Sequence, residues 1–219
     1  MIEGAIFDLD GTLLDSMHIW NNMGENYLRS IGYEPRENLN ETFLTMSLKE
    51  AAEYYVSEYG VTLSVEEIMA GVNDMTARYY RNEAAVKPGV PEFLEKLKER
   101  GVKMCVATAT DRPYVEAALD RCGIRRYFSG IFTCTEVGSG KNVPVIFRKA
   151  LDFLGTEKEK TVIFEDALYA IKTAKRDGFK VVAIRDRHQK HPDACAELSD
   201  VSIKDFTGLE EFWEFAESL

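Results

Sequence analysis

The chain has 219 residues, enough for one large domain or for one domain that carries a smaller insertion. Hydrophobic residues make up 45% and charged residues 29% of it, which argues against a disordered or fibrous protein. Asp plus Glu outnumber Lys plus Arg by 37 to 27, so the formal net charge is -10. Because this charge repels nucleic-acid backbones and anionic membrane surfaces, we expect neither as a partner. A monomer is only the default, since nothing in the sequence indicates the oligomeric state.

The cysteines and the N-terminus bear on the cellular compartment. Cys105, Cys122, Cys134 and Cys195 form no CxxC pair, and we expect them to be reduced. No apolar run approaches the ~18 residues needed to span a bilayer. The N-terminal MIEGAIFDLDG carries acids where a signal peptide would have its apolar core. The expected compartment is the cytoplasm.

Short apolar runs rich in β-branched residues predict the buried strands of a parallel sheet. They are GAIFDL from Gly4, VKMCVAT from Val102, TVIFED from Thr161, FKVVAI from Phe179, and a weaker run at residues 130–133. Between them, helical patterns that end at a glycine cover residues 91–100, 113–122, 143–154 and 167–177. Because strands and helices alternate with short links, we predict a doubly wound α/β core domain, residues 1–15 plus 87–219.

About 90 residues separate the first predicted strand from the second, and their apolar residues recur at helical spacing. The stripes are Trp20, Met23, Tyr27 and Ile31; Leu48, Ala51, Ala52, Tyr55, Val56 and Tyr59; and Val65, Ile68, Met69, Val72, Met75 and Tyr79. Ser64 and Glu67 form a capping box at the start of the third stripe. We therefore predict a helical cap domain at residues 16–86. Its tyrosines, Tyr54, Tyr55, Tyr59, Tyr79 and Tyr80, are expected to pack rather than to line a ligand pocket.

The clearest chemical signal is FDLDGT, which puts two carboxylates at the carboxyl end of a predicted strand, the edge where open parallel sheets bind ligands. Period-two geometry turns Asp8 and Asp10 to the same side, so both can face one bound atom or metal. A calcium loop that begins at Asp8 would need glycine and glutamate at its sixth and twelfth positions, which hold Leu13 and Ile19. A hairpin turn is disfavoured by the helical pattern that follows.

Four short motifs lie at the ends of successive predicted elements, with the insertion after the first. They are FDLDGT with Asp8 and Asp10, VATAT with Thr108, GSGKNVP with Lys141, and FEDA with Glu165 and Asp166. In this order the chain resembles the haloacid dehalogenase superfamily over essentially its full length. The resemblance is strongest to phosphatases and phosphomutases with a helical cap, such as phosphoglycolate phosphatase and β-phosphoglucomutase, and it implies a Rossmann-like core.

The resemblance implies a catalytic or phosphate-binding role for each of these motifs. Asp8 would attack phosphorus, while Asp10 would protonate the leaving oxygen and then activate water. A carboxylate with a reference pKa near ~3.9 is ionised at neutral pH, so Asp8 needs no tuning. The Thr108 hydroxyl and the Ala109 amide would hold the phosphoryl oxygens, and Lys141 would offset their charge.

The resemblance also implies Mg²⁺ as the cofactor. Its ligands would be Asp8, the backbone carbonyl of Asp10, and Asp166, with Glu165 supporting them from behind. A threonine after a strand is by itself more often a helix cap, and Thr110 can fill that role.

The chain departs from the family pattern at a few positions and also offers competing motifs. Asn142 and Val145 replace residues of the usual Lys-Pro-x-Pro-Asp, and Ala167 and Ala170 replace a serine and a glycine after the acidic pair. A Walker loop fails because Thr135 and Asn142 stand where it needs glycine and Ser or Thr. His188, His191 and Cys195 have spacing suited to zinc, but a fourth ligand is missing, so we favour a solvated loop.

The resemblance implies a Mg²⁺-dependent phosphatase that hydrolyses a small phosphorylated metabolite through an aspartyl-phosphate. In the family that the chain resembles, the dehalogenases lack the second aspartate of the motif. The presence of Asp10 therefore disfavours dehalogenation. A phosphomutase is the alternative: mutases carry an arginine after a cap serine, where this chain has Thr45-Met46-Ser47-Leu48, with Lys49, Arg29, Arg78 or Arg81 as substitutes. A catalytically silent metabolite-binding module is the alternative from a different class. The sequence does not identify the phosphate ester.

Overall fold

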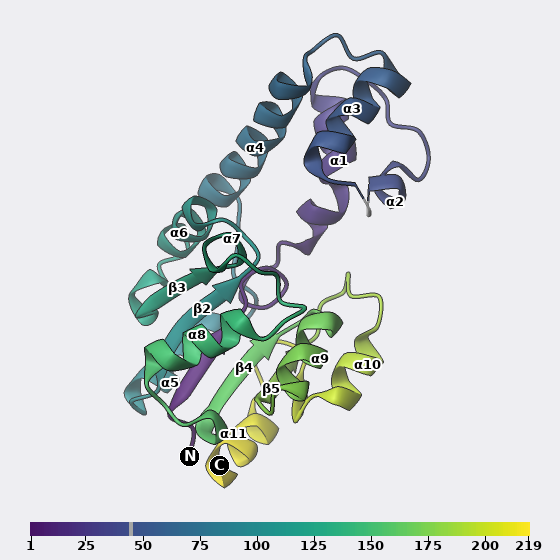
Figure 1. Ribbon diagram of the computed structural model, residues 1–219. Helices are drawn as coiled ribbons and strands as arrows, with labels where there is room; N and C mark the ends of the chain where they lie inside the picture. Colours follow the sequence, from purple (N-terminus) through teal and green to yellow (C-terminus); the bar gives the residue numbers. More distant parts are fainter. Residues whose placement is uncertain (44–45) are drawn as a thin grey trace. The chain divides into compact units, whose positions relative to one another are not determined.

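The computed structural model describes residues 1–43 and 46–219. Its described part contains a six-stranded sheet, all parallel, in the order β3-β2-β1-β4-β5-β6 (Figure 1). The strands are β1 (Gly4–Phe7), β2 (Lys103–Thr108), β3 (Gly130–Thr133), β4 (Thr161–Glu165), β5 (Lys180–Ile184) and β6 (Val201–Ile203). The strand order reverses between β1 and β4, and an open α/β sheet binds its ligands at this switch point.

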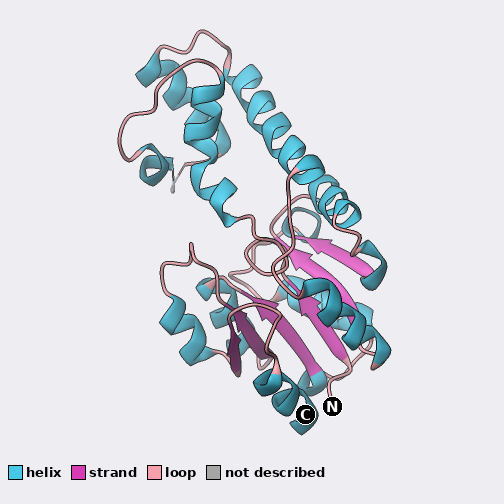
Figure 2. Ribbon diagram, turned by 180° about the vertical axis from the view of Figure 1, so that it is seen from behind, coloured by secondary structure: helices cyan, strands magenta, loops and turns pink. Residues whose placement is uncertain are grey.

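Helices cover both faces of the sheet, as the two opposite views show (Figures 1 and 2). The helices of this unit are α5 (Val90–Glu99), α6 (Arg112–Arg121), α7 (Cys134–Val137), α8 (Val145–Leu154), α9 (Leu168–Arg176), α10 (Pro192–Leu198) and α11 (Glu210–Ser218). Strands β1, β2, β4 and β5 are buried along almost their whole length, which explains why their sequences are apolar runs rather than alternating patterns. The predicted doubly wound α/β class is confirmed.

The two faces of the sheet have different cores. On one face, Ile6 and Ile163 join a cluster with buried residues of α8 and α9, such as Phe147 and Ile171. On the other face the core is aromatic: the Phe7 and Phe164 rings stack at 4.4 Å between centroids. Phe93 of α5 and Phe212 of α11 pack on Phe164 at 5.5 and 5.6 Å. This packing fixes β1 and β4, whose carboxyl ends carry the candidate site.

The sequence patterns did not predict β6 or α11. Strand β6 has only three residues and lies at the sheet edge, so its apolar signal is short. Helix α11 lacks a side-chain cap, which removes the usual start signal. Both elements extend the core at its C-terminal end.

Residues Met17–Glu83 form a separate compact unit, while Met1–Ser16 and Ala84–Leu219 form the sheet unit. The predicted cap domain, residues 16–86, contains this helical unit. Its helices are α1 (Met17–Ser30), α2 (Leu39–Phe43), α3 (Leu48–Tyr59) and α4 (Val65–Asn82). In the described residues of both units, none of the helices is long and apolar enough to cross a membrane.

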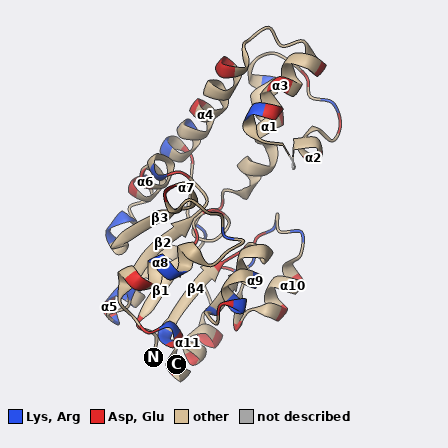
Figure 3. Ribbon diagram, viewed as in Figure 1, with Lys and Arg blue, Asp and Glu red and all other residues tan. Residues whose placement is uncertain are grey.

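The helical unit follows the sequence pattern closely. The capping box at Ser64 and Glu67 is present, and α4 carries Glu66 in its first turn and Arg81 in its last, which suits the helix dipole (Figure 3). Tyr55 and Tyr80 are fully buried. The core of this unit also includes Tyr27, with Tyr54 and Tyr59 packed against it. These tyrosines therefore pack, as expected.

Candidate active site

Asp8 lies directly after β1, beside the end of β4. The Asp8 amide donates a hydrogen bond of 3.0 Å to the carbonyl of Phe164, which continues the pairing of the two strands. Gly11 then adopts a φ of 82°, a conformation that glycine adopts without strain, and this lets the chain turn back across the sheet edge. Asp166 follows β4. The two acids predicted to act together therefore stand on either side of the switch point.

Lys141 lies between two carboxylates of this site. Its ammonium pairs with Asp8 Oδ1 and, at 2.8 Å, with Glu165 Oε2. All three side chains are buried. The other oxygen of Glu165, Oε1, accepts hydrogen bonds from the amides of Asp166 (3.2 Å) and Ala167 (3.1 Å). Glu165 thus orients both the lysine and the turn that carries Asp166.

The pKa values of Asp8, Asp166 and Lys141 are all raised, which disfavours the charged form of the two acids and favours that of the lysine. Burial, and then the neighbouring Glu165 charge, raise the pKa of Asp8 to about 7, against the pull of Lys141. The pKa of Asp166 is also raised, first by burial and then by Glu165 and Asp8. Lys141 has a raised pKa because the carboxylates outweigh its burial. The packing that holds Asp8 also removes it from water, so its pKa in the metal-free site lies above the reference value near ~3.9.

The site has the donor set of a metal centre. Oxygens of Asp8, Glu165 and Asp166 lie within 4.8 Å of one another, and all three residues are buried. One ammonium faces these three carboxylates, so the cluster lacks positive charge, and an oxygen-preferring divalent cation would supply it. The residues present fit a metal ion. Glu165, expected to stand behind the ligands, contributes an oxygen to this group.

Asp10 is held by two hydroxyl groups. Ser16 Oγ donates to its Oδ1 and Thr110 Oγ1 donates to its Oδ2, each at 2.6 Å. Thr110 is not the cap of the following helix, because the N-cap of α6 is Asp111. The threonine instead contacts Asp10, a pairing that sequence reasoning missed. No local signal could reveal it, since 100 residues separate the two side chains.

The remaining predicted phosphate ligands lie at the end of β2. Thr108 is buried, and its Oγ1 accepts a hydrogen bond of 3.1 Å from the Thr110 amide. Ala109 is exposed. Strand β2 pairs with β1 in register, with Val106 opposite Phe7, so both strands end at the same edge of the sheet. Thr108 and Asp8 consequently belong to one row of strand ends.

The competing zinc motif does not assemble. Among the described residues, the one cluster of possible ligands is the group with Asp8, and it contains neither histidine nor cysteine. Cys195 is buried and its thiol contacts the carbonyl of Asp166 at 3.5 Å, while His188 Nε2 accepts a hydrogen bond from Arg187. All four cysteines are free thiols.

Comparison with known proteins identifies the class and then the family. A parallel sheet with acids at its switch point is typical of an α/β enzyme. The family model of the haloacid dehalogenase-like hydrolases matches residues 5–184, and the chain belongs to this family.

Relatives extend over nearly the whole chain. The chain is 31% identical to validoxylamine A 7'-phosphate phosphatase of Streptomyces hygroscopicus subsp. limoneus, covering 94% of this chain and 95% of that protein. It is 27% identical to a phosphorylated carbohydrates phosphatase of Thermotoga maritima, with 82% and 83% covered. Among solved structures, a candidate β-phosphoglucomutase of Thermotoga maritima matches with a TM-score of 0.85 and 25% identity, over 97% of this chain and 99% of that one.

Proposed function

We propose that this hydrolase is a Mg²⁺-dependent phosphatase of a small phosphorylated metabolite, a sugar phosphate or a similar ester. The observation that carries the proposal is the buried cluster of Asp8, Lys141, Glu165 and Asp166 at the switch point. Its support from the comparisons is that two relatives bear the names of phosphatases, one of them for phosphorylated carbohydrates.

The proposed reaction uses the two oxygens of Asp8 differently. Lys141 occupies Oδ1, so Oδ2 attacks phosphorus and the bond to the leaving oxygen breaks. Asp10 gives its proton to that oxygen, and the phosphoryl group remains on Asp8 as an aspartyl-phosphate. Asp10, now a carboxylate, takes a proton from water, which attacks phosphorus and releases phosphate and the Asp8 carboxylate.

Several groups of the chain support these steps. Ser16 and Thr110 hold both oxygens of Asp10 and so aim the acid. The Thr108 hydroxyl and the Ala109 amide are the proposed donors to the phosphoryl oxygens. A bound Mg²⁺, held by Asp8, Asp166 and the Asp10 carbonyl, would neutralise phosphoryl charge and lower the pKa of Asp8.

The helical unit offers little for a second phosphate, which a phosphomutase needs. The Ser47 side chain caps α3 by accepting a hydrogen bond from the Glu50 amide, and Leu48 is the first residue of that helix. Thr45 lies outside the described residues. Three of the cations considered as substitutes pair with acids of their own unit: Arg29 with Glu25, Lys49 with Glu53 and Arg78 with Asp74. We therefore favour hydrolysis over isomerisation.

The test is hydrolysis of p-nitrophenyl phosphate with and without Mg²⁺. Wild-type protein should need the metal, and Asp8→Asn should lose activity by a factor of at least about 1,000, because the nucleophile is gone. Asp152→Asn, a change at an exposed position of α8, serves as the matched control and should keep activity. Persistent turnover by Asp8→Asn refutes the aspartyl-phosphate mechanism, while inactivity of wild type on a broad phosphate-ester screen favours a silent module.

A further inference from the structure

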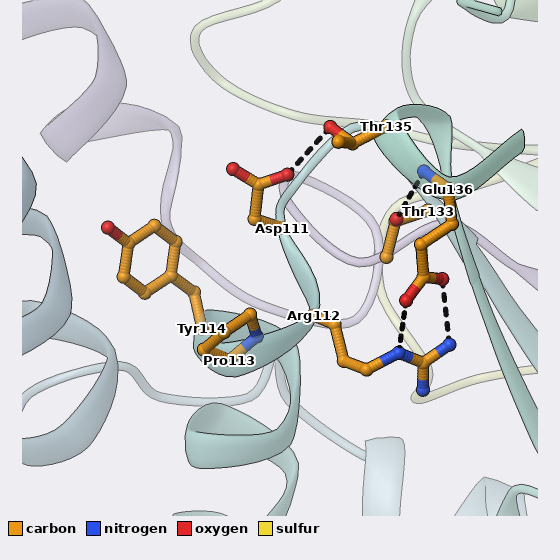
Figure 4. A pocket seen from close by; sticks show the side chains of 7 residues that line it. All are labelled: Asp111, Arg112, Pro113, Tyr114, Thr133, Thr135 and Glu136. Carbon is orange, nitrogen blue, oxygen red and sulfur yellow. Dashed lines mark hydrogen bonds and ion pairs between the residues drawn. The ribbon is translucent and has the colours of Figure 1, made fainter. Parts of the chain in front are cut away.

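A cavity of about 380 Å³ opens in the sheet unit between the start of α6 and the junction where β3 passes directly into α7 (Figure 4). Its walls come from residues 111–114, 133, 135 and 136. The volume lies within the range of about 300–1,000 Å³ typical of small-molecule sites. None of its residues belongs to the catalytic cluster, so its purpose is unassigned.

The cavity adjoins the proposed phosphate site. Thr133, at the end of β3, is the register partner of Thr108, and neighbouring strands lie about 4.8 Å apart. Asp111 directly follows Thr110, whose hydroxyl holds the Asp10 carboxylate. If Asp10 protonates the leaving oxygen, the rest of the leaving group lies next to this wall.

Asp111 is the uncompensated charge of the cavity. Arg112 and Glu136 neutralise each other through two hydrogen bonds, and the arginine also donates to the Ile131 carbonyl at 2.8 Å. Asp111 accepts a hydrogen bond of 2.7 Å from Thr135 on Oδ1, yet it forms no ion pair within residues 1–43 and 46–219. The cavity therefore carries one net negative charge.

The Asp111 side chain does not cap the helix that follows it. An aspartate at an N-cap normally accepts an amide hydrogen bond from the first turn of its helix. Asp111 makes no such bond: Pro113 has no N–H, and the Tyr114 amide donates to the Asp111 carbonyl at 3.0 Å instead. Its Oδ2 thus has no partner among the described residues and can accept a hydrogen bond from a ligand.

Apolar surface accompanies this carboxylate. Figure 4 shows the Pro113 and Tyr114 rings on one side of Asp111 and the Arg112–Glu136 pair on the other. Rings of this kind pack against the C–H face of a sugar or cyclitol, while carboxylates accept hydrogen bonds from its hydroxyl or ammonium groups. A second phosphate would meet the Asp111 charge instead and be repelled.

We propose that this cavity is the leaving-group subsite and takes a hydroxylated or aminated ring without a second anionic group. The inference rests on the proposed phosphatase function and narrows its substrates to monophosphates of sugars, amino sugars or cyclitols. The repulsion between the Asp111 carboxylate and a second phosphate is a physical reason to favour a phosphatase over a mutase that uses a bisphosphate.

The test compares three esters of one scaffold: glucose 6-phosphate, glucosamine 6-phosphate and glucose 1,6-bisphosphate. We expect wild type to favour both monophosphates over the bisphosphate by at least about tenfold in kcat/KM, since like charges in contact disfavour the wrong ligand. Asp111→Asn should bring the ratio to within about threefold, and Asp111→Lys should invert it. Asp120→Asn removes the same charge from the exposed end of α6 and should leave the ratio unchanged.

The outcomes separate the subsite from the chemistry. Ratios that stay at the wild-type value in both Asp111 variants, with folding verified by circular dichroism, overturn the subsite while Asp8-dependent hydrolysis of p-nitrophenyl phosphate preserves the proposed function. A wild-type preference for the bisphosphate also overturns it. Hydrolysis of p-nitrophenyl phosphate by Asp8→Asn would instead overturn the function itself.

Discussion

Thr110 donates a hydrogen bond of 2.6 Å to the Oδ2 of Asp10, joining the turn after β2 to the turn after β1. In the proposed mechanism, this bond restrains the acid that protonates the leaving oxygen. Because Ser16 holds the other oxygen, loss of Thr110 would remove the restraint on Oδ2 and keep the one on Oδ1.

Thr110→Val should therefore lower kcat more than it changes KM. A hydrogen bond to a charged group contributes about 1.5–3 kcal/mol, which corresponds to a loss of about 10- to 100-fold in kcat if it is needed in the transition state. Thr173→Val is the control, since Thr173 is also buried but its hydroxyl donates to the Tyr169 carbonyl within α9. An effect confined to KM would contradict a positioning role for Thr110.

Lys141→Met should damage both activity and stability. The change removes the cation that pairs with Asp8 and Glu165, and leaving buried charges unpaired costs about 3–5 kcal/mol. Without this cation, we expect phosphatase activity to fall by at least about 100-fold.

Urea unfolding and steady-state kinetics together check the Lys141 prediction. Lys175→Met provides the comparison, since it breaks the less buried pair with Asp200 on the other side of β5, and its activity should stay close to wild type. Equal stability of Lys141→Met and wild type would mean that the two carboxylates are neutral in the metal-free protein.

Continuous apolar runs made β1, β2, β4 and β5 predictable, because a parallel strand buried on both faces needs apolar side chains at every position. The proximity of Asp8 and Asp166 was equally readable, since both belong to short motifs placed at strand ends. What could not be predicted depends on packing between distant segments. The raised pKa of Asp8 arises from burial by neighbouring strands, and the contact of Thr110 with Asp10 crosses two turns.

A second unpredicted contact is the buried ion pair of Lys87 with Asp186. A lysine beside Pro88 and Gly89 is typical of an exposed linker, and no hydrophobic periodicity around it indicates that its side chain is buried. Lys87 Nζ lies 2.7 Å from Asp186 Oδ2 and 3.3 Å from the Arg185 carbonyl, and both side chains of the pair are almost inaccessible. The Lys87 amide donates to Leu13 at 2.8 Å, so the pair also anchors the return of the chain from the helical unit.

Lys87→Met should lower the free energy of unfolding by about 3–5 kcal/mol, because it leaves Asp186 buried and unpaired. In the wild-type chain the His188 amide donates a hydrogen bond of 2.8 Å to Asp186 Oδ1. Asp186→Asn keeps an oxygen that can accept this bond. The double variant should recover part of the loss, giving a coupling energy of at least about 1 kcal/mol in a double-mutant cycle. Strict additivity in urea unfolding would show that the pair contributes nothing beyond its separate residues.

Asp177 provides a prediction of pH dependence away from the active site. Arg148 and then, after the opposing effect of burial, Lys158 lower the pKa of Asp177. Arg148 Nε lies 3.0 Å from Oδ2, and Lys158 Nζ lies 3.2 Å from the same oxygen. Because the folded pKa is below that of the unfolded chain, near ~3.9, this carboxylate stabilises the fold above pH ~4 and loses that contribution as pH falls through the folded pKa.

Asp177→Asn should consequently be less stable than wild type by about 1.5–3 kcal/mol at pH 7, the range for hydrogen bonds to a charged group. The gap should shrink as the pH falls below about 4, because wild type then loses the charge that the variant never had. Thermal unfolding of both proteins from pH 3 to pH 7 measures the gap, with Asp152→Asn on the exposed side of α8 as the control. A gap in stability that stays constant across this range would contradict the prediction. It would mean that Asp177 stabilises the fold through packing and not through its charge.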